Sequence, residues 1–180
     1  MTSVLYIGEM VRLELVQQME KGQIFASCPR LSSKLGYEGR ISADDVSLIE
    51  SDTNGYLITK HLLKKLDMED HYTEGDCQAV RSVCKAVTKR AADLAAAGLA
   101  TLINHLDDPD ITVAIEGRLK EYYPGFLNQM EKRTRELVKP HLQFEIVRSQ
   151  EGSSTGAALL AAAVFPSFPK MAPNKVTSGH

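Results

Sequence analysis

The stretch FEIVRSQEGSSTGAALLAAAVF, residues 144–165, decides the fold class of this chain. Its first four residues are rich in aromatic and β-branched side chains and predict a buried strand. The alanine-rich end has high helix propensity and predicts a helix from Ser153 to Phe165. A strand, a glycine-containing turn and a helix in this order are typical of an α/β protein.

The turn between this strand and helix is compatible with a bound phosphate. Gly152 and Gly156 let the backbone turn tightly, and a helix N-terminus offers unpaired N–H groups and a favourable dipole to an anion. Ser153, Ser154 and Thr155 can donate hydrogen bonds or cap the helix. An ordinary βα turn with a serine cap explains the same residues, so the turn alone leaves both interpretations open. It is not a P-loop, because no lysine follows Gly156.

A second strand is predicted upstream at ITVAI, residues 111–115, where β-branched side chains run up to Glu116-Gly117. A hairpin turn is the simplest interpretation of that dipeptide. Residues 119–122 then predict a further strand, and Pro124 opens a helix from about residue 125 to 138. The side chains of that helix expected to face inward are Phe126, Met130 and Leu137.

The part of the chain before these strands is predicted to be helical. Apolar periodicity and capping residues predict helices over Val4–Met19, Ala43–Ile49, Tyr56–Leu66 and about Asp76–Leu106. Residues 27–40 lack such a period and predict a long connection. In the longest helix the expected inward side chains are Val80, Val83, Cys84, Val87, Ala91, Leu94, Ala95, Leu99 and Leu102. The small side chains of its segment AADLAAAGLA, residues 91–100, predict close packing against a sheet.

We expect one domain over residues 1–165 and a frayed tail over 166–180. Two or three strands seldom form a self-sufficient sheet, so the sheet is expected to be incomplete. Apolar surface left uncovered by missing strands would favour self-association.

Composition excludes several classes of protein. The 180 residues include no apolar stretch near the roughly 20 residues that a membrane span needs. The net charge is −2 with dispersed lysines and arginines, which argues against a nucleic-acid partner. Cys28, Cys77 and Cys84 are an odd number without zinc-site spacing, which favours a reducing, cytoplasmic compartment. Cys77 and Cys84 share a helix face, as small buried side chains more often than as ligands.

From about Tyr6 to Ala163 the chain resembles the hexokinase family, the ATP-dependent hexose 6-kinases. The segments that carry the resemblance, in order, are Tyr6-Ile7-Gly8-Glu9-Met10-Val11-Arg12, Ile49-Glu50-Ser51-Asp52, Val83-Cys84 with Arg90-Ala91-Ala92 and Ala97-Gly98-Leu99-Ala100, Ile111–Gly117, Tyr123-Pro124-Gly125-Phe126, and Glu151–Leu159. No segment is decisive by itself, but this many in the right order are hard to obtain by chance.

The resemblance implies part of a ribonuclease H-like (actin/hexokinase) domain, helix-rich with a short incomplete sheet. It also implies ATP with Mg²⁺ as cofactors and a sugar hydroxyl as acceptor, at the entry to glycolysis. The residues that it places beside the nucleotide are Gly152, Ser153, Ser154, Thr155, Gly156, Ala157 and Ser47. The family's catalytic aspartate and its sugar-binding residues lie upstream of the matched segment. We therefore assign no catalytic residue and no metal ligand here, and expect hexose binding only with that upstream lobe.

Several positions depart from the family pattern. Ser154 and Ala114 replace glycines, and Glu116 replaces an aspartate. Ala43-Asp44 stands where the resemblance places Thr-Arg, and an acid there weakens attraction for a polyanion. These departures leave open a non-catalytic hexokinase-like module that binds a nucleotide or a partner, and a generic α/β domain without a ligand.

Overall fold

The structure is a computed structural model that describes residues 4–27, 33–69, 71–116, 124–148 and 153–164. Its helices and strands are α1 (Val4–Glu20), α2 (Ser33–Gly36), α3 (Ala43–Ser51), α4 (Leu57–Lys65), α5 (Glu74–Leu106), β1 (Asp110–Ile115), α7 (Pro124–Leu137), β2 (Gln143–Arg148) and α8 (Ser153–Val164). The four long predicted helices before β1 are confirmed. The predicted strand over residues 119–122 and the predicted tail lie outside the described residues, so the domain boundary after residue 165 stays a prediction.

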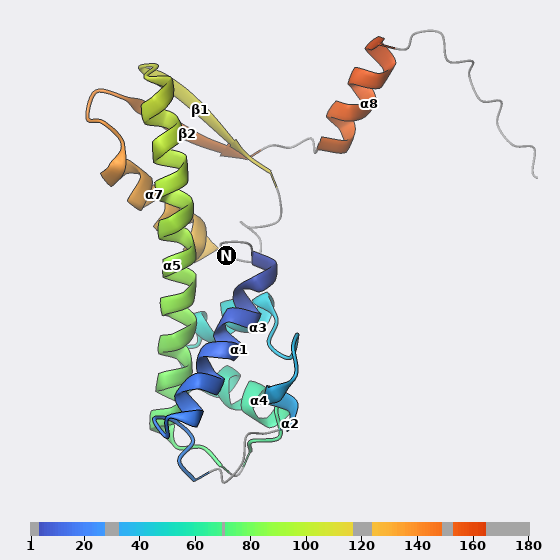
Figure 1. The fold of residues 1–180 in the computed structure, drawn as a ribbon, viewed down its shortest axis with the longest axis vertical. Coiled ribbons are helices and arrows are strands. Elements are labelled where there is room, and N and C mark those ends of the chain that lie inside the picture. Colours follow the sequence, from blue (N-terminus) through green and yellow to red (C-terminus); the bar gives the residue numbers. More distant parts are fainter. Residues whose placement is uncertain (1–3, 28–32, 70, 117–123, 149–152, 165–180) are drawn as a thin grey trace, which may run out of the picture.

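Helix α5 is the long axis around which the other elements pack (Figure 1). Helices α1, α3 and α4 lie along its first half, and α7 and the two strands lie along its second half. The larger hydrophobic core lies among α1, α3, α4, α5 and the start of α7, and the smaller core joins the ends of α5 and α7 to the strands. Among the described residues, no helix is both long and apolar enough to cross a bilayer.

Helix α1 is tied closely to the segment that follows α2. A side chain at Gly8 would overlap the carbonyl oxygen of Ile41, and an ideal Cβ would lie 2.8 Å from the carbonyl carbon of Ile41. Four residues on, the buried Arg12 donates to Glu9 Oε2 at 2.8 Å and to the carbonyl oxygen of Leu35 at 2.9 Å. The hydrogen bond from Arg12 lowers the pKa of Glu9. The absence of a side chain at Gly8 lets the loop after α2 lie against α1, and the Arg12–Glu9 pair holds α2 there.

The N-terminus of α5 is closed by a capping box. Thr73 Oγ1 accepts a hydrogen bond from the N–H of Asp76 at 3.2 Å, and Asp76 Oδ2 accepts from the N–H of Thr73 at 2.7 Å. Asp76 Oδ1 also accepts from the N–H of Phe25 at 2.7 Å, which links the helix to the segment after α1. The predicted start at Asp76 was wrong by two residues, because this cap lies one turn earlier.

The C-terminus of α5 is fixed to the end of α7. Asn104 Nδ2 donates to the carbonyl oxygen of Leu137 at 3.1 Å, and Asn104 Oδ1 accepts from the N–H of Lys139 at 2.9 Å. Both halves of one amide thus bind backbone groups where α7 ends. The Leu137 carbonyl belongs to the last turn of α7, where carbonyl groups lack donors inside the helix itself.

The buried face of α5 differs from the predicted one at two leucines. Leu94 and Leu102 are 45% and 63% exposed, whereas Ala92, Ala96 and Ala100 are buried. The alanines face α7 and the strands because small side chains let the partner elements approach the helix closely. The inward prediction was also wrong for Leu137, which is 38% exposed.

The other inward predictions hold, with the residues buried or half-buried. They are Val80, Val83, Cys84, Val87, Ala91, Ala95 and Leu99 in α5, and Phe126 and Met130 in α7. Cys77 and Cys84 are free and buried as predicted, and burial raises the pKa of Cys84 to about 12. Cys28 lies outside the described residues.

The two strands form a parallel sheet in which Ile111 pairs with Phe144 and Ile115 with Arg148. Side chains on β1 alternate, so Ile111, Val113 and Ile115 are half-buried and their neighbours are exposed. The strands predicted at residues 111–115 and 144–147 are confirmed. The alanine-rich segment of α5 packs mainly on α7, and only its end, at Leu99 and Ala100, shares a core with the strands. The short helix α2 lies inside the predicted connection. It was not predicted, because the apolar residues there show no helical periodicity.

Candidate functional site

The candidate site lies where the two parallel strands end. Because β1 and β2 run in the same direction, their carboxyl ends meet at one edge of the sheet. The exposed Glu116 follows β1 at this edge, and α8 begins a few residues after β2. Ligands of open α/β sheets commonly bind at this edge.

Helix α8 carries most of the predicted nucleotide-binding residues. Gly152 lies outside the described residues, as do the side chains of Ser153 and Ser154, although both serines belong to the first turn of α8. Thr155, Gly156 and Ala157 are exposed. A Cβ built on Gly156 meets no atom within 4 Å, so the start of the helix is open to a ligand.

Ser47 lies in a different part of the molecule. It is a half-buried residue of α3, which packs against α1, α4 and α5. Figure 1 shows α8 standing well apart from α3. The structure therefore brings residues 153–157 together on one helix but does not bring Ser47 to them.

The start of α8 has the general property of a helix N-terminus. Its first-turn N–H groups have no acceptor inside the helix and favour an anion. The described cavities are lined by residues of other elements, and the described residues contain no cluster of three His, Cys, Asp or Glu side chains suited to a metal. Adenine and Mg²⁺ would therefore need groups from outside the described part of the chain.

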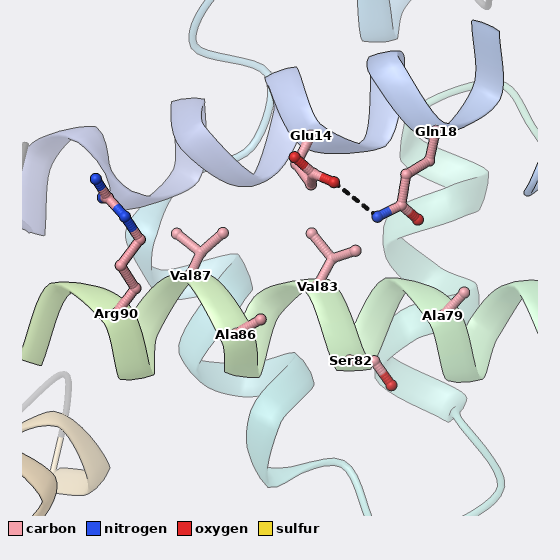
Figure 2. Close-up of a pocket in the computed structure, with 8 residues that line it drawn as sticks. All are labelled: Glu14, Gln18, Ala79, Ser82, Val83, Ala86, Val87 and Arg90. Carbon is pink, nitrogen blue, oxygen red and sulfur yellow. Dashed lines mark hydrogen bonds between the residues drawn. The ribbon is translucent and has the colours of Figure 1, made fainter. Parts of the chain in front are cut away.

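Sequence reasoning missed two adjoining grooves along the exposed side of α5. One, of about 460 Å³, lies between α1 and α5, and Figure 2 shows Val83 and Val87 pointing into it. Glu14 accepts a hydrogen bond from Gln18 at 2.8 Å on its α1 side. The other, of about 560 Å³, lies between α5 and α7 and shares Ala86 and Arg90 with the first. No periodicity signals these grooves, because they result from small residues facing solvent between helices.

A smaller pocket of about 200 Å³, which has polar residues around a largely apolar wall, was also missed. It lies where α3, α5 and the start of α7 meet. Its lining residues are Glu50, Lys85, Thr88, Lys89, Gly125 and Gln129. These come from separate parts of the sequence, so only the fold brings them together.

Comparison with known proteins identifies the family to which the chain belongs. The family profile described as hexokinase matches residues 1–163. The chain belongs to the hexokinase family. It is 34% identical to human hexokinase-1 over 171 residues, covering 92% of this chain and 18% of that protein. It is 35% identical to hexokinase type 1 of Drosophila melanogaster over 163 residues, covering 89% of this chain and 34% of that protein.

Solved hexokinases have the same fold. The Schistosoma mansoni hexokinase complexed with glucose superposes with a TM-score of 0.79 at 28% identity, covering 88% of this chain and 35% of that one. The predicted partial actin/hexokinase-like fold is confirmed. The chain spans well under half the length of the hexokinases that it matches.

Two of the segments that carry the hexokinase resemblance have structural roles here. Gly8, Glu9 and Arg12 hold the loop after α2 on α1. The buried Asp52 accepts hydrogen bonds from the N–H groups of Ile58 and Thr59 at 2.9 and 3.1 Å and so caps α4. The contacts of these residues hold neighbouring elements of the scaffold together.

Proposed function

We propose that this chain supplies the nucleotide side of an ATP-dependent hexokinase, with the start of α8 beside the phosphates. Support comes from the family match over residues 1–163, and from the parallel strand and helix unit whose open helix start favours an anion. In this proposal ATP provides the phosphoryl group, Mg²⁺ bridges its phosphates, and the acceptor is the 6-hydroxyl of glucose or a similar hexose.

We propose further that the 180-residue chain does not phosphorylate a hexose by itself. Phosphoryl transfer needs a base near the acceptor and donors around the sugar, all held in register. No described residue of the candidate site is assigned to either role. Hexose binding would then require the lobe that other hexokinases carry upstream of the matched segment.

A coupled ADP-release assay with glucose tests this second part. We expect no turnover from the 180-residue chain, and ADP release that depends on glucose would refute the proposal. A further assay adds a separate chain that carries the upstream lobe of a hexokinase, where turnover would support a complementary role.

Nucleotide binding tests the first part. We expect Gly152→Val to abolish ATP binding measured by calorimetry, because a branched side chain disfavours a tight glycine turn. Gly98→Ala is the matched control, since Gly98 lies in α5 with nothing within 4 Å of its Cβ position. Unchanged affinity in Gly152→Val would show that the turn is not the site. ATP binding without turnover in the presence of the upstream lobe would favour the non-catalytic module instead.

The free, buried Cys77 and Cys84 are consistent with a reducing compartment, and we place the chain in the cytoplasm. Self-association is the partner interaction that we propose. All the described side chains of α8 are exposed, including Leu159 and Leu160 at 63% and 65%. Exposed apolar surface of this kind favours association.

A further inference from the structure

The 200 Å³ pocket between α3, α5 and α7 is lined by residues with buried polar atoms that lack partners among the described residues. Thr88 is 4% exposed, and its Oγ1 has no hydrogen-bond partner in the described residues. Glu50 Oε1, on the neighbouring α3, is likewise buried and without a partner. The Thr88 hydroxyl lies near enough to Glu50 to lower the pKa of its carboxyl, although burial has the larger effect and raises that pKa. Such groups are uncommon in native interiors, because each costs its desolvation free energy.

A second buried threonine shows that helix geometry does not by itself leave a threonine hydroxyl without a hydrogen-bond partner. A threonine in a helix commonly donates to the carbonyl oxygen four residues earlier. Thr134 in α7 is fully buried and donates to the carbonyl oxygen of Met130 at 2.8 Å. Thr88 makes no such bond, and it lines the 200 Å³ pocket. Its hydroxyl is therefore available to a group that enters the pocket.

The charges around the pocket balance. Lys89 Nζ lies 2.5 Å from Asp93 Oδ2, and Gln129 Nε2 donates to Asp93 Oδ1 at 2.8 Å. Lys85, which makes no ion pair within the described part of the chain, is offset by Glu50. Two acids and two bases give no net charge, so neither a free anion nor a free cation is strongly favoured.

The lining residues that remain supply both donors and acceptors. Glu50 Oε1 and the side-chain carbonyl of Gln129 accept, while Lys85 donates and Thr88 does both. Gly125 is the second residue of α7, where a backbone N–H has no acceptor inside the helix. Hydroxyl groups donate and accept at the same atom, so a ligand with several hydroxyls matches this mixture of donors and acceptors better than a phosphate or a carboxylate does.

We infer that this pocket is a second binding site, separate from the start of α8, for a small uncharged polyol such as glycerol or a monosaccharide. Its volume holds roughly six to seven waters at about 30 Å³ each. That space is below the roughly 300–1,000 Å³ typical of sites for drug-sized ligands. The site does not depend on ATP binding or on catalysis.

Two-dimensional amide NMR of the 180-residue chain tests this site, with glycerol, glucose and inorganic phosphate as separate probes. We expect saturable shifts at Thr88, Gly125 and Gln129 with glycerol and glucose, and none with phosphate. Two results would overturn the inference: shifts that saturate with phosphate but with neither polyol, and no saturable shift with any of the three probes. The second result would mean that water alone fills the pocket.

Variants of Thr88 separate a bound ligand from a general solvent effect. Thr88→Val keeps the shape but removes the hydroxyl, and we expect the dissociation constant to rise about fivefold, as for one lost hydrogen bond. Thr88→Ser should restore most of the affinity. Thr101→Val, at an exposed α5 threonine that donates to the carbonyl oxygen of Ala97, is the matched control. Equal affinity in Thr88→Val and Thr101→Val would contradict the site, and Glu50→Gln provides the same comparison if Thr88→Val does not fold.

Discussion

Gly8 determines how closely two segments of the chain approach each other. Its position beside Ile41 and Ser42 leaves no room for a β-carbon, and the atoms in the way are backbone atoms that cannot rotate aside. Gly98 is also a helix glycine, but its Cβ position is open. Substituting the two glycines by alanine therefore distinguishes the steric effect of a β-carbon from its effect on helix propensity.

We expect Gly8→Ala to destabilise the fold by about 3 kcal/mol, since overpacking against backbone forces α1 away from the loop. Gly98→Ala should instead stabilise the chain by about 0.5–1 kcal/mol through helix propensity. Urea unfolding followed by circular dichroism measures both. Equal effects of the two substitutions would show that α1 does not need this close approach.

We expect Arg12→Ala to lower the free energy of unfolding by about 2–4 kcal/mol. The change leaves Glu9 and the Leu35 carbonyl without their donor in a largely buried setting. Arg133→Ala is the control, because its ion pair with Glu136 is exposed and screened. The unfolding midpoint should fall clearly for the first variant and stay unchanged for the second.

At the scale of the element, the start of α5 depends on one carboxylate. Burial alone would raise the pKa of Asp76, but hydrogen bonds from Phe25 and Thr73 outweigh it and hold the pKa below its ordinary value. A carboxyl whose folded pKa is lowered stabilises the fold above its unfolded pKa. That contribution is lost as the pH falls through the folded pKa.

We therefore expect Asp76→Asn to destabilise the chain at about pH 7, and the difference between the two chains to shrink as the pH falls below about 4, the ordinary pKa of an aspartate in the unfolded chain. Urea midpoints of both chains across this range measure the difference. A gap between the two chains that is constant with pH would mean that the charge of Asp76 does not contribute.

The sequence was sufficient to predict most elements but not all their faces. Apolar periodicity located α1 and α4 closely, while the capping residue Ser42 located α3 and Pro124 located the start of α7. Periodicity failed at Leu94 and Leu102, since close packing selects small side chains and leaves the larger ones outside. The start of α5 was predicted two residues late, although Thr73 and Asp76 have the spacing of a capping box.

Prediction of the candidate site was limited in a different way. A glycine turn after a strand is a local signal, so α8 was placed correctly from its own residues. Thr88 and Glu50 give no local signal, because each is ordinary in its helix. Only the packing of α3 on α5 brings them together.

At the scale of the whole molecule, α8 is an apolar helix that no other described element covers. It is apolar along most of its length, yet its described side chains are exposed. We expect the chain to self-associate as its concentration rises, as measured by sedimentation velocity. Leu160→Glu should shift it toward the monomer, because a charge opposes burial of the helix.

Leu57→Glu is the control for this experiment, since Leu57 is a leucine of α4 that is also 65% exposed. If both substitutions reduce association equally, the contact does not involve α8. If neither does, exposed apolar surface is not what joins the copies.

The uninterrupted α5 fixes a direction as well as a distance. Its 33 residues extend about 50 Å at 1.5 Å per residue, with each residue turned about 100° from the last. One residue inserted between Ala86 and Gly98 would rotate the strands and α7 by about 100° relative to α1. The carboxyl edge of the sheet would then face a different side of the molecule. The number of residues in α5 therefore determines how that edge is oriented relative to α1.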